Sequence, residues 1–330
     1  MGDSIRQGET PYPQQDVPGG AAPAGCKTYD GLIVGGGPAG LSAAIYLARF
    51  NRSVLVVDAG EGRSTSHEVN ENYLGFPDGI AARDLRRLGQ QQAVRFGVQF
   101  AESRVDAVTR DGVDFRVDCG GEDVMGRTLI LATGVVDQFP EFEGVEEYVG
   151  RSLFWCITCD GWTTRGKRVI VVGRSDEAAM TCLQFQNFTD RITFLTNCEP
   201  AELELSERSR RNLDNAGVPV TEGCIARVHG ESGMMRSVEL RDGRRIELDM
   251  MVSQQGSRPN SELAKALGAK LSEDGYVEVD EEQRTGLAKL YAAGDLTRMF
   301  SHQVVTAAHE GATAGQSANY DLYRTEQREE

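Results

Sequence analysis

The sequence predicts an α/β protein built on two doubly wound, Rossmann-like nucleotide-binding folds with parallel central sheets. Three observations support this prediction. A short apolar strand at 32–34 runs into the glycine-rich turn GGGPAG and then into a helix of small and apolar residues. A second apolar strand, at 169–172, also ends at a glycine that precedes a helix. Between the two units lies a Cys-x-x-Cys pair formed by Cys156 and Cys159.

The first unit carries a complete dinucleotide-binding fingerprint. Gly35 allows the tight turn after the strand, Gly37 lets a pyrophosphate approach the backbone, and Gly40 lets the helix and strand pack closely. The helix N-terminus directs free amides and its positive dipole end toward the phosphates. The next strand, at 53–57, ends at Asp58, where a carboxylate can accept a hydrogen bond from a ribose hydroxyl. The sequence therefore predicts a dinucleotide bound to the first fold.

Length and composition fit a protein of two ordinary domains. The chain has 330 residues, of which 40% are hydrophobic and 26% are charged, which is normal for globular proteins. The formal net charge of −15 argues against a nucleic-acid partner. The apolar runs are too short to span a bilayer, and the N-terminus lacks a basic stretch leading into an apolar core. We therefore expect a cytoplasmic protein that binds neither membranes nor nucleic acids.

The cysteine pattern predicts redox chemistry rather than a metal site or a disulfide-stapled domain. The count of seven is odd, and only Cys156 and Cys159 are closely spaced. Structural zinc would need two further ligands, usually in another tight Cys or His pair, and the sequence shows none, so we predict no metal site. A Cys-x-x-Cys pair can close a small disulfide loop in which one thiol is tuned as a nucleophile. Its place between two nucleotide folds predicts electron transfer between a bound cofactor and this disulfide.

Four motifs in order make the chain resemble the low-molecular-weight thioredoxin reductases, from about Tyr29 to about Tyr320. The motifs are GGGPAG at 35–40, Ala-Thr-Gly at 132–134, Cys-Ile-Thr-Cys-Asp-Gly at 156–161, and Ala-Ala-Gly-Asp at 292–295, which precedes a helix containing Gln303. The resemblance implies an FAD-dependent thiol-disulfide oxidoreductase that forms a homodimer. Its partner would be a thioredoxin-like protein or a small-molecule disulfide or dithiol.

The resemblance also implies that the second fold is inserted into the first. The FAD domain would comprise 28–138 and 263–320, and the inserted domain with the dithiol and a second nucleotide site would be 139–262. Residues 1–27, rich in Pro, Gly, Gln and Ala, predict a flexible arm, and the charged segment 321–330 predicts a separate C-terminal tail.

The residues that the resemblance assigns to FAD come from separate segments of the chain. The fingerprint would hold the pyrophosphate, Asp58 would hold the adenosine ribose, and the later segments would approach the flavin. The full set is Gly35, Gly37, Pro38, Ala39, Gly40, Asp58, Arg63, Ser64, Asn72, Thr133, Gly134, Gly294, Asp295, His302, Gln303 and Val304. His302 departs from the family, in which an arginine precedes the glutamine.

By the same resemblance, the two thiols and the adjacent acid have different roles. Cys159 would lie next to the flavin, Cys156 would attack a partner disulfide, and Asp160 would protonate the leaving thiolate. An aspartate of ordinary acidity is ionised at neutral pH, so this role requires a shielded site that raises its pKa. The alternative for Asp160 is a turn residue before Gly161.

The second fingerprint departs from the family at its phosphate-binding turn. Gly173 is kept, but Ser175 stands where the backbone should approach a pyrophosphate. Asp176 and Glu177 add negative charge at the same helix start, and Arg174 offsets only part of it. A phosphate is therefore disfavoured here.

A second departure follows the strand at 192–195. NADPH-using relatives carry a His-Arg-Arg run there to grip the 2′-phosphate, whereas this chain has Thr196, Asn197 and Cys198. Arginine on a phosphate is a strong charge-assisted contact that these residues cannot replace. We therefore expect NADPH to bind poorly or not at all, which places the chain closest to the nicotinamide-independent branch of the family.

Several electron routes are compatible with this altered site. It could hold a second FAD, as in diflavin-linked disulfide oxidoreductases, with Thr196 and Asn197 hydrogen-bonded to the adenosine. Reduced ferredoxin could reduce the flavin directly, although the acidic surplus makes an acidic ferredoxin an awkward partner. Substrate thiols could instead pass electrons through the flavin to oxygen, as in a dithiol oxidase. A non-enzymatic redox sensor is a further alternative, and the intact dithiol argues against it.

Overall fold

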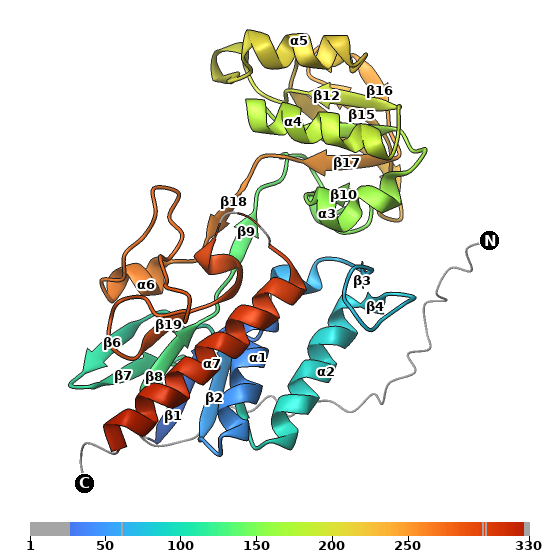
Figure 1. The fold of residues 1–330 in the computed structure, drawn as a ribbon. Coiled ribbons are helices and arrows are strands. Elements are labelled where there is room, and N and C mark those ends of the chain that lie inside the picture. The colour runs from blue at the N-terminus through green and yellow to red at the C-terminus, as the bar shows by residue number, and fades with distance from the viewer. Residues whose placement is uncertain (1–26, 61, 299, 301, 327–330) are drawn as a thin grey trace.

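A computed structural model describes residues 27–60, 62–298, 300 and 302–326 (Figure 1). The predicted N-terminal arm lies outside these residues, apart from its last residue. Two largely parallel sheets, one above the other in Figure 1, organise the described chain. No helix among the described residues is both long enough and apolar enough to cross a membrane.

The first sheet has the strand order β5-β2-β1-β8-β7-β6, with β19 paired to β8. Strands β1, β2, β5, β8 and β19 run parallel, and β6 and β7 form an antiparallel extension. The strand bounds are β1 Thr28–Val34, β2 Val54–Asp58, β5 Gln99–Glu102, β6 Val108–Asp111, β7 Asp114–Asp118, β8 Asp123–Leu131 and β19 Leu290–Ala292. Because β19 joins the sheet so late in the chain, the long segment after β8 is free to build a second unit.

Helices α1 (Pro38–Arg49), α2 (Ala82–Arg95) and α7 (Val304–Glu326) cover this sheet, and the short α6 (Glu262–Ala266) lies beside β6 and β7 in Figure 1. Helices α1 and α7 cross closely because glycines face the α1 backbone. A Cβ atom added to Gly311 would lie 2.0 Å from the Ala39 carbonyl oxygen. A short hairpin of β3 (Val69–Asn70) and β4 (Ile80–Ala81) precedes α2.

This contact gives a test of the fold. Gly311→Ala forces α1 and α7 apart, and we expect it to lower the free energy of unfolding by about 3 kcal/mol. Gly89→Ala on α2 is the matched control, because its added Cβ meets only the movable end of Leu41 at 3.0 Å. The gain in helix propensity there should keep the change within about 1 kcal/mol. Urea denaturation measures both values, and equal destabilisation of the two variants would contradict the close crossing.

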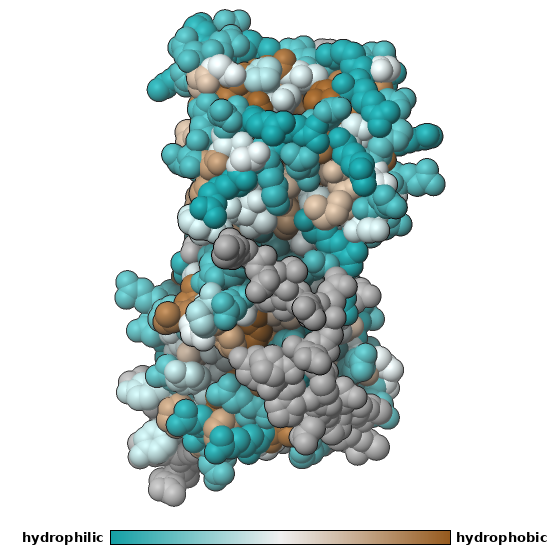
Figure 2. Space-filling model, turned by 90° about the vertical axis from the view of Figure 1, so that its right-hand side faces the viewer, coloured by the Kyte–Doolittle hydropathy of each residue, from teal (hydrophilic) through white to brown (hydrophobic). Residues whose placement is uncertain are grey.

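The second sheet has the order β10-β17-β11-β12-β13, and all its strands are parallel. Its strands are β10 Leu153–Phe154, β11 Val169–Val172, β12 Ile192–Leu195, β13 Val220–Thr221 and β17 Met250–Ser253. Strands β11 and β17 are buried along their whole length, as expected for parallel strands covered on both faces. Helices α4 (Asp176–Gln184) and α5 (Glu207–Asn215) and an antiparallel sheet of β14 (Ile225–Glu231), β15 (Met234–Leu240) and β16 (Arg245–Glu247) complete this unit. Hydrophilic residues predominate on its surface in the upper part of Figure 2.

The chain passes twice between the two units, through β9 (Val135–Asp137) and β18 (Ser257–Pro259), which pair antiparallel. Thr133 and Asn260 tie the two passages together, because the Thr133 hydroxyl donates to the Asn260 carbonyl at 2.7 Å and the Asn260 amide returns a bond to the Thr133 carbonyl at 2.9 Å. The β9–β18 pair lies close to the predicted domain boundaries at 138/139 and 262/263, which stay predictions.

The C-terminus differs from the sequence prediction, because no separate tail begins at residue 321. Helix α7 continues to Glu326. Leu322 is fully buried, and the carboxylate of Asp321 accepts hydrogen bonds from the Tyr291 hydroxyl and the Arg284 guanidinium. These tertiary contacts hold a charged segment in helical form. Residues 327–330 lie outside the described residues.

Candidate active site

A cleft of about 610 Å³ opens between the glycine turn after β1 and the dithiol segment. Nearly every residue assigned to FAD from the sequence lines it: Gly35, Gly37, Pro38, Ala39, Asp58, Arg63, Ser64, Asn72, Thr133, Gly134, Gly294, Asp295, His302, Gln303 and Val304. Cys159 and Asp160 line the same cleft, whereas Cys156 does not. Gly40 does not line the cleft; it lies where α1 packs against the glycine turn, and an added Cβ would meet the Gly35 carbonyl oxygen at 1.9 Å. The fold thus brings the dithiol to the mouth of the first nucleotide site.

The backbone around this turn fits the pyrophosphate and ribose of FAD. Gly35 has a φ of 108°, and a Cβ there would lie 2.3 Å from the Ala132 carbonyl oxygen. Helix α1 begins directly after Gly37 without a side-chain cap, so its first amides are left for a ligand. The Gly36 amide donates to Asp58 Oδ1 at 2.9 Å and orients that carboxylate.

The cleft also contains a cation that the sequence did not reveal. Arg86 on α2 forms an ion pair with Asp58 and donates to the Gly60 carbonyl at 3.0 Å. Its charge neutralises the Asp58 carboxylate beside the predicted adenosine site. No local motif marks Arg86, because it lies on a helix remote in sequence from the fingerprint.

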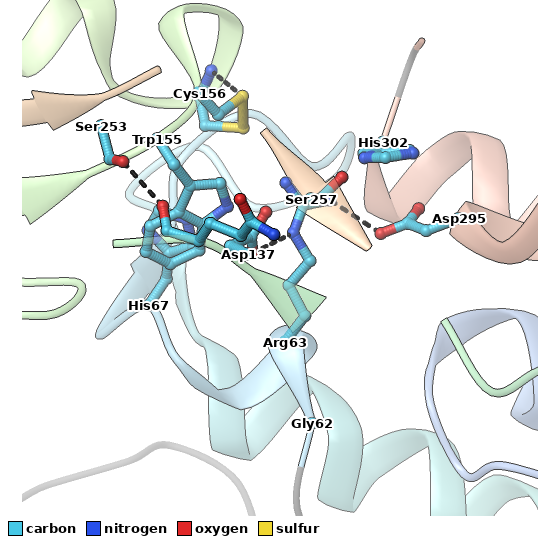
Figure 3. A network of polar contacts seen from close by, with 12 residues as sticks. Gly62, Arg63, His67, Asp137, Trp155, Cys156, Ser253, Ser257, Asp295 and His302 are labelled. Carbon is cyan, nitrogen blue, oxygen red and sulfur yellow. Dashed lines mark hydrogen bonds and ion pairs between the residues drawn. A yellow bond between two sulfur atoms is a disulfide. The ribbon is translucent and has the colours of Figure 1, made fainter. Parts of the chain in front are cut away.

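Arg63 joins three segments at the floor of the cleft (Figure 3). Its Nε atom lies 2.7 Å from Asp137 Oδ2, and its Nη1 atom lies 2.7 Å from Asp295 Oδ2. The two carboxylates come from β9 and from the 3₁₀ turn after β19. Both ion pairs are largely buried, so Arg63 fixes the predicted cofactor residue Asp295 relative to the passage between the units. The aspartate at 137 was not among the predicted site residues.

A buried acid that was not predicted from the sequence stabilises the 3₁₀ turn after β19. Glu310 on α7 accepts from the Gly294 amide at 2.8 Å and from the Thr297 hydroxyl at 3.1 Å, and it pairs with Arg298 at 2.5 Å. His302 Nε2 lies 2.6 Å from the Arg298 carbonyl oxygen. The departure from arginine at 302 therefore gives a side chain that holds the loop.

The two cysteines form a disulfide at the start of α3 (Ile157–Asp160). Cys156 is the N-cap, and its sulfur accepts from the Cys159 amide at 3.1 Å. The Gln303 amide nitrogen lies 3.3 Å from Cys159 Sγ and 3.5 Å from Cys156 Sγ. Asn72 holds that glutamine through a 2.9 Å bond to its Oε1 atom. Gln303 therefore contacts both sulfurs directly, and Asn72 is linked to them through Gln303. Both residues were predicted to approach the flavin.

Asp160 occupies the shielded site that an acid needs. It is 5% exposed, and burial raises its pKa to about 8, although Arg63 opposes the shift. Within the described residues, its Oδ2 atom has no hydrogen-bond partner. The group is therefore protonated at neutral pH and can donate a proton.

His67 reaches across from the FAD-side loop to the dithiol segment (Figure 3). Its Nδ1 atom lies 3.5 Å from Asp160 Oδ1, and its ring centroid lies 4.4 Å from that of Trp155. Burial, with the nearby Arg63, lowers the His67 pKa to about 4, so the imidazole is neutral. A neutral imidazole places no positive charge beside Asp160, so it does not favour loss of the Asp160 proton. The only sequence signal for His67 is its place four residues after Arg63.

A small acidic cavity lies beside the predicted second nucleotide site, and Thr196 is the only residue of that predicted set in its lining. Its volume is about 240 Å³, and its lining includes Glu199, Glu222 and Asp242. Arg241 also lines it, but its Nη1 atom lies 3.2 Å from Glu199 Oε1. Arg174 is exposed and faces Glu202 at 4.0 Å. A phosphate entering this cavity would meet carboxylates, and its lining arginine is already paired.

Polar side chains predicted to bind in the second site already have partners within the protein. Thr196 Oγ1 accepts from the Gly223 amide at 3.3 Å, and Asn197 Oδ1 accepts from the Ile225 amide at 2.8 Å. The other predicted residues do not line the acidic cavity; they are Gly173, Arg174, Ser175, Asp176 and Glu177. Ser175 caps α4, Asp176 accepts from the Ser206 amide, and Gly173 packs against Ala178. Nucleotide binding at this set stays a prediction.

Comparison with known proteins gives the same assignment as the geometry. A family model for the pyridine nucleotide-disulphide oxidoreductases matches residues 29–312. Thioredoxin reductase of Treponema pallidum is 32% identical over 298 residues, covering 88% of this chain and 96% of the relative. Thioredoxin reductase of Bacillus subtilis is 30% identical over 303 residues, covering 89% and 95%.

Solved structures agree over almost the whole chain. The crystal structure of HlmI superimposes with a TM-score of 0.85 at 28% identity and covers 94% of this chain and 97% of its own. A putative thioredoxin reductase, TrxB, from Bacillus anthracis has a TM-score of 0.83 at 26% identity, covering 91% and 99%. The predicted α/β architecture with two Rossmann-like folds is confirmed. The chain therefore belongs to the pyridine nucleotide-disulphide oxidoreductase family and is a thioredoxin reductase-like, flavin-dependent disulfide oxidoreductase.

Proposed function

We propose that this enzyme exchanges electron pairs between FAD in the first fold and a substrate disulfide or dithiol, through Cys156 and Cys159 and with little use of NADPH. The observation that carries the proposal is that Cys159 lines the same cleft as the glycine fingerprint. FAD, when bound, supplies a carrier that accepts and returns an electron pair. The substrate is a thioredoxin-like protein, as the names of the relatives suggest, or a small-molecule disulfide or dithiol.

The chain's own residues account for the sulfur chemistry. In the reduced enzyme, the Cys156 thiolate attacks one sulfur of a substrate disulfide, forms a mixed disulfide and releases one substrate thiolate. The Cys159 thiolate then attacks the Cys156 sulfur, closes the protein disulfide and releases the second thiolate. Asp160, protonated below about pH 8, gives its proton to a leaving thiolate. Substrate dithiols are oxidised by the reverse steps.

The weak use of NADPH follows from charge. The cavity that would take the 2′-phosphate is lined by three carboxylates and by an arginine already paired with one of them. Without a group that prefers the 2′-phosphate, NADPH should reduce the enzyme no faster than NADH does. Anaerobic mixing with each nucleotide, followed by flavin absorbance, measures both rates. Rapid bleaching by NADPH with a clear preference over NADH would contradict this proposal.

The electron donor, the acceptor and the oligomeric state are finer parts of the same proposal. Released flavin per chain separates one FAD from two, and a second FAD in the small domain stays a prediction. Oxygen consumption driven by a small dithiol tests the oxidase direction, and reduction by ferredoxin tests a protein donor. We also propose that the protein is cytoplasmic and forms a homodimer. The homodimer is supported by exposed aromatic side chains on α1, just after it and on α7, namely Tyr46, Phe50, Tyr320 and Tyr323.

A further inference from the structure

Two cysteines outside the active site lie on neighbouring segments of the second unit. Strands β12 and β13 are parallel, with Phe194 opposite Val220 and Leu195 opposite Thr221. Cys198 and Cys224 each follow the last paired residues, Leu195 and Thr221, by three positions. Paired strands lie about 4.8 Å apart, so the segments that leave them begin close together.

The two segments stay together beyond the strands. The Thr196 amide donates to the Thr221 carbonyl at 3.1 Å. The Gly223 amide donates to Thr196 Oγ1 at 3.3 Å, and the Ile225 amide donates to Asn197 Oδ1 at 2.8 Å. These bonds flank Cys224 on one chain and hold the two residues before Cys198 on the other, so the two cysteine segments are tied together beyond the paired strands.

Both thiols also face the same space. Cys198 and Cys224 both line the cavity of about 240 Å³ beside the second site, and Cys224 Sγ lies 3.6 Å from Glu199 Oε1. Cys119 and Cys182, in contrast, are packed in the two hydrophobic cores. A shared, solvent-connected cavity gives small reagents a route to the first two thiols.

We propose that Cys198 and Cys224 form a second dithiol, which small-molecule disulfides oxidise reversibly to an intrachain disulfide. The Cys224 thiolate attacks the small disulfide, breaks its S–S bond and releases one small thiolate. The Cys198 thiolate then attacks the Cys224 sulfur, forms the intrachain bond and releases the second small thiolate. The two protons of the protein thiols pass to the two released thiolates. The protein dithiol is oxidised, and the small disulfide is reduced.

The new bond would fix a segment that covers the second nucleotide turn. After Cys198 the chain crosses that turn, where the Glu204 amide donates to the Arg174 carbonyl at 2.8 Å and the Ser206 amide donates to Asp176 Oδ1 at 2.8 Å. Oxidation ties the start of this segment to the start of β14. The redox state of this pair thereby controls how far the second site can open.

Reaction at this dithiol should be slow at neutral pH. Burial raises the pKa of both thiols; Glu202 and Glu222 add to the shift at Cys198, and Glu199 adds to it at Cys224. Arg174 and Arg241 oppose these carboxylates. Because the thiolate is the nucleophile, the oxidation rate should rise with pH.

The test uses the full-length flavoprotein with Cys26, Cys156 and Cys159 replaced by serine, which removes the active dithiol and the cysteine outside the described residues. The chromogenic aromatic disulfide dithio-bis-nitrobenzoate is the reagent. We expect the protein to release both halves of the reagent as thiol and to retain neither. Adding Cys198→Ser should leave one half bound to Cys224, and adding Cys182→Ser should change nothing.

Peptide mass spectrometry of the native protein locates the product. A linked peptide containing Cys198 and Cys224, which dithiothreitol separates again, is the expected result. Reagent retained on Cys224 while Cys198 is present, or a linked peptide formed only after denaturation, would overturn the proposal.

Discussion

Replacing either Cys156 or Cys159 by serine is expected to reduce substrate turnover to the rate of the uncatalysed background. A hydroxyl cannot form or break a sulfur–sulfur bond, and no other described thiol lines the cleft that holds the fingerprint. FAD binding should persist, because its predicted contacts lie on other segments. The measurement is the recovery of flavin absorbance after dithionite-reduced enzyme is mixed anaerobically with a disulfide.

Cys182→Ser is the matched control for these variants. Cys182 is buried on α4 in the core of the second unit and should tolerate serine without loss of rate. Recovery of flavin absorbance at the wild-type rate in a Cys156→Ser/Cys159→Ser enzyme would show that electrons bypass the dithiol.

Asp160→Asn is expected to slow the same reaction about 100-fold at neutral pH, which is within the usual contribution of a general acid. An amide keeps the shape of the side chain but cannot release a proton. In the wild type, Asp160 loses its proton as the pH rises through about 8, so the rate should fall there. The variant should lack this fall, and a variant with the wild-type rate and pH profile would remove Asp160 from the mechanism.

Stability gives an independent readout of the same group. The folded-state pKa of Asp160 is about 8, well above the ordinary value of 3.8, so the folded protein binds this proton more tightly than the unfolded chain does. Raising the pH from about 4 to about 8 therefore destabilises the wild type relative to the variant. Asp160→Asn should have the higher melting temperature at alkaline pH, and a lower one would indicate damage to the fold.

The fold class and the core of the site could be predicted because their signals are local in sequence. Gly35, Gly37 and Asp58 follow fixed spacings set by one strand, turn, helix and strand. The dithiol and its acid are contiguous, and a buried Asp160 satisfies the requirement deduced from its proposed role.

The residues that the sequence did not reveal act through contacts distant in the chain. Asp137 accepts a hydrogen bond from Arg63 across 74 positions, and no periodicity or spacing marks such a pair. His67 acquires its place beside Asp160 only when the two units come together. Patterns within single elements cannot predict contacts of this kind.

Local composition also misled at the C-terminus. The segment from Asp321 resembles a solvated tail, but burial of Leu322 and the bond from Tyr291 stabilise it as helix. Thr196 and Asn197 stay predicted ligands of the second site, but the fold adds that each side-chain oxygen already accepts a hydrogen bond from a backbone amide. A sequence shows that a polar group is present, whereas only the fold shows whether that group is already satisfied.

Transfer of electrons between the sulfur pair and the flavin is tested most directly by anaerobic addition of a small dithiol to the oxidised enzyme. The wild type and Cys182→Ser should lose flavin absorbance as dithiol is added, because the dithiol reduces the Cys156–Cys159 disulfide and the electrons continue to the flavin. The Cys156→Ser/Cys159→Ser enzyme should keep its flavin oxidised over the same period. Equal bleaching in all three proteins would contradict the account.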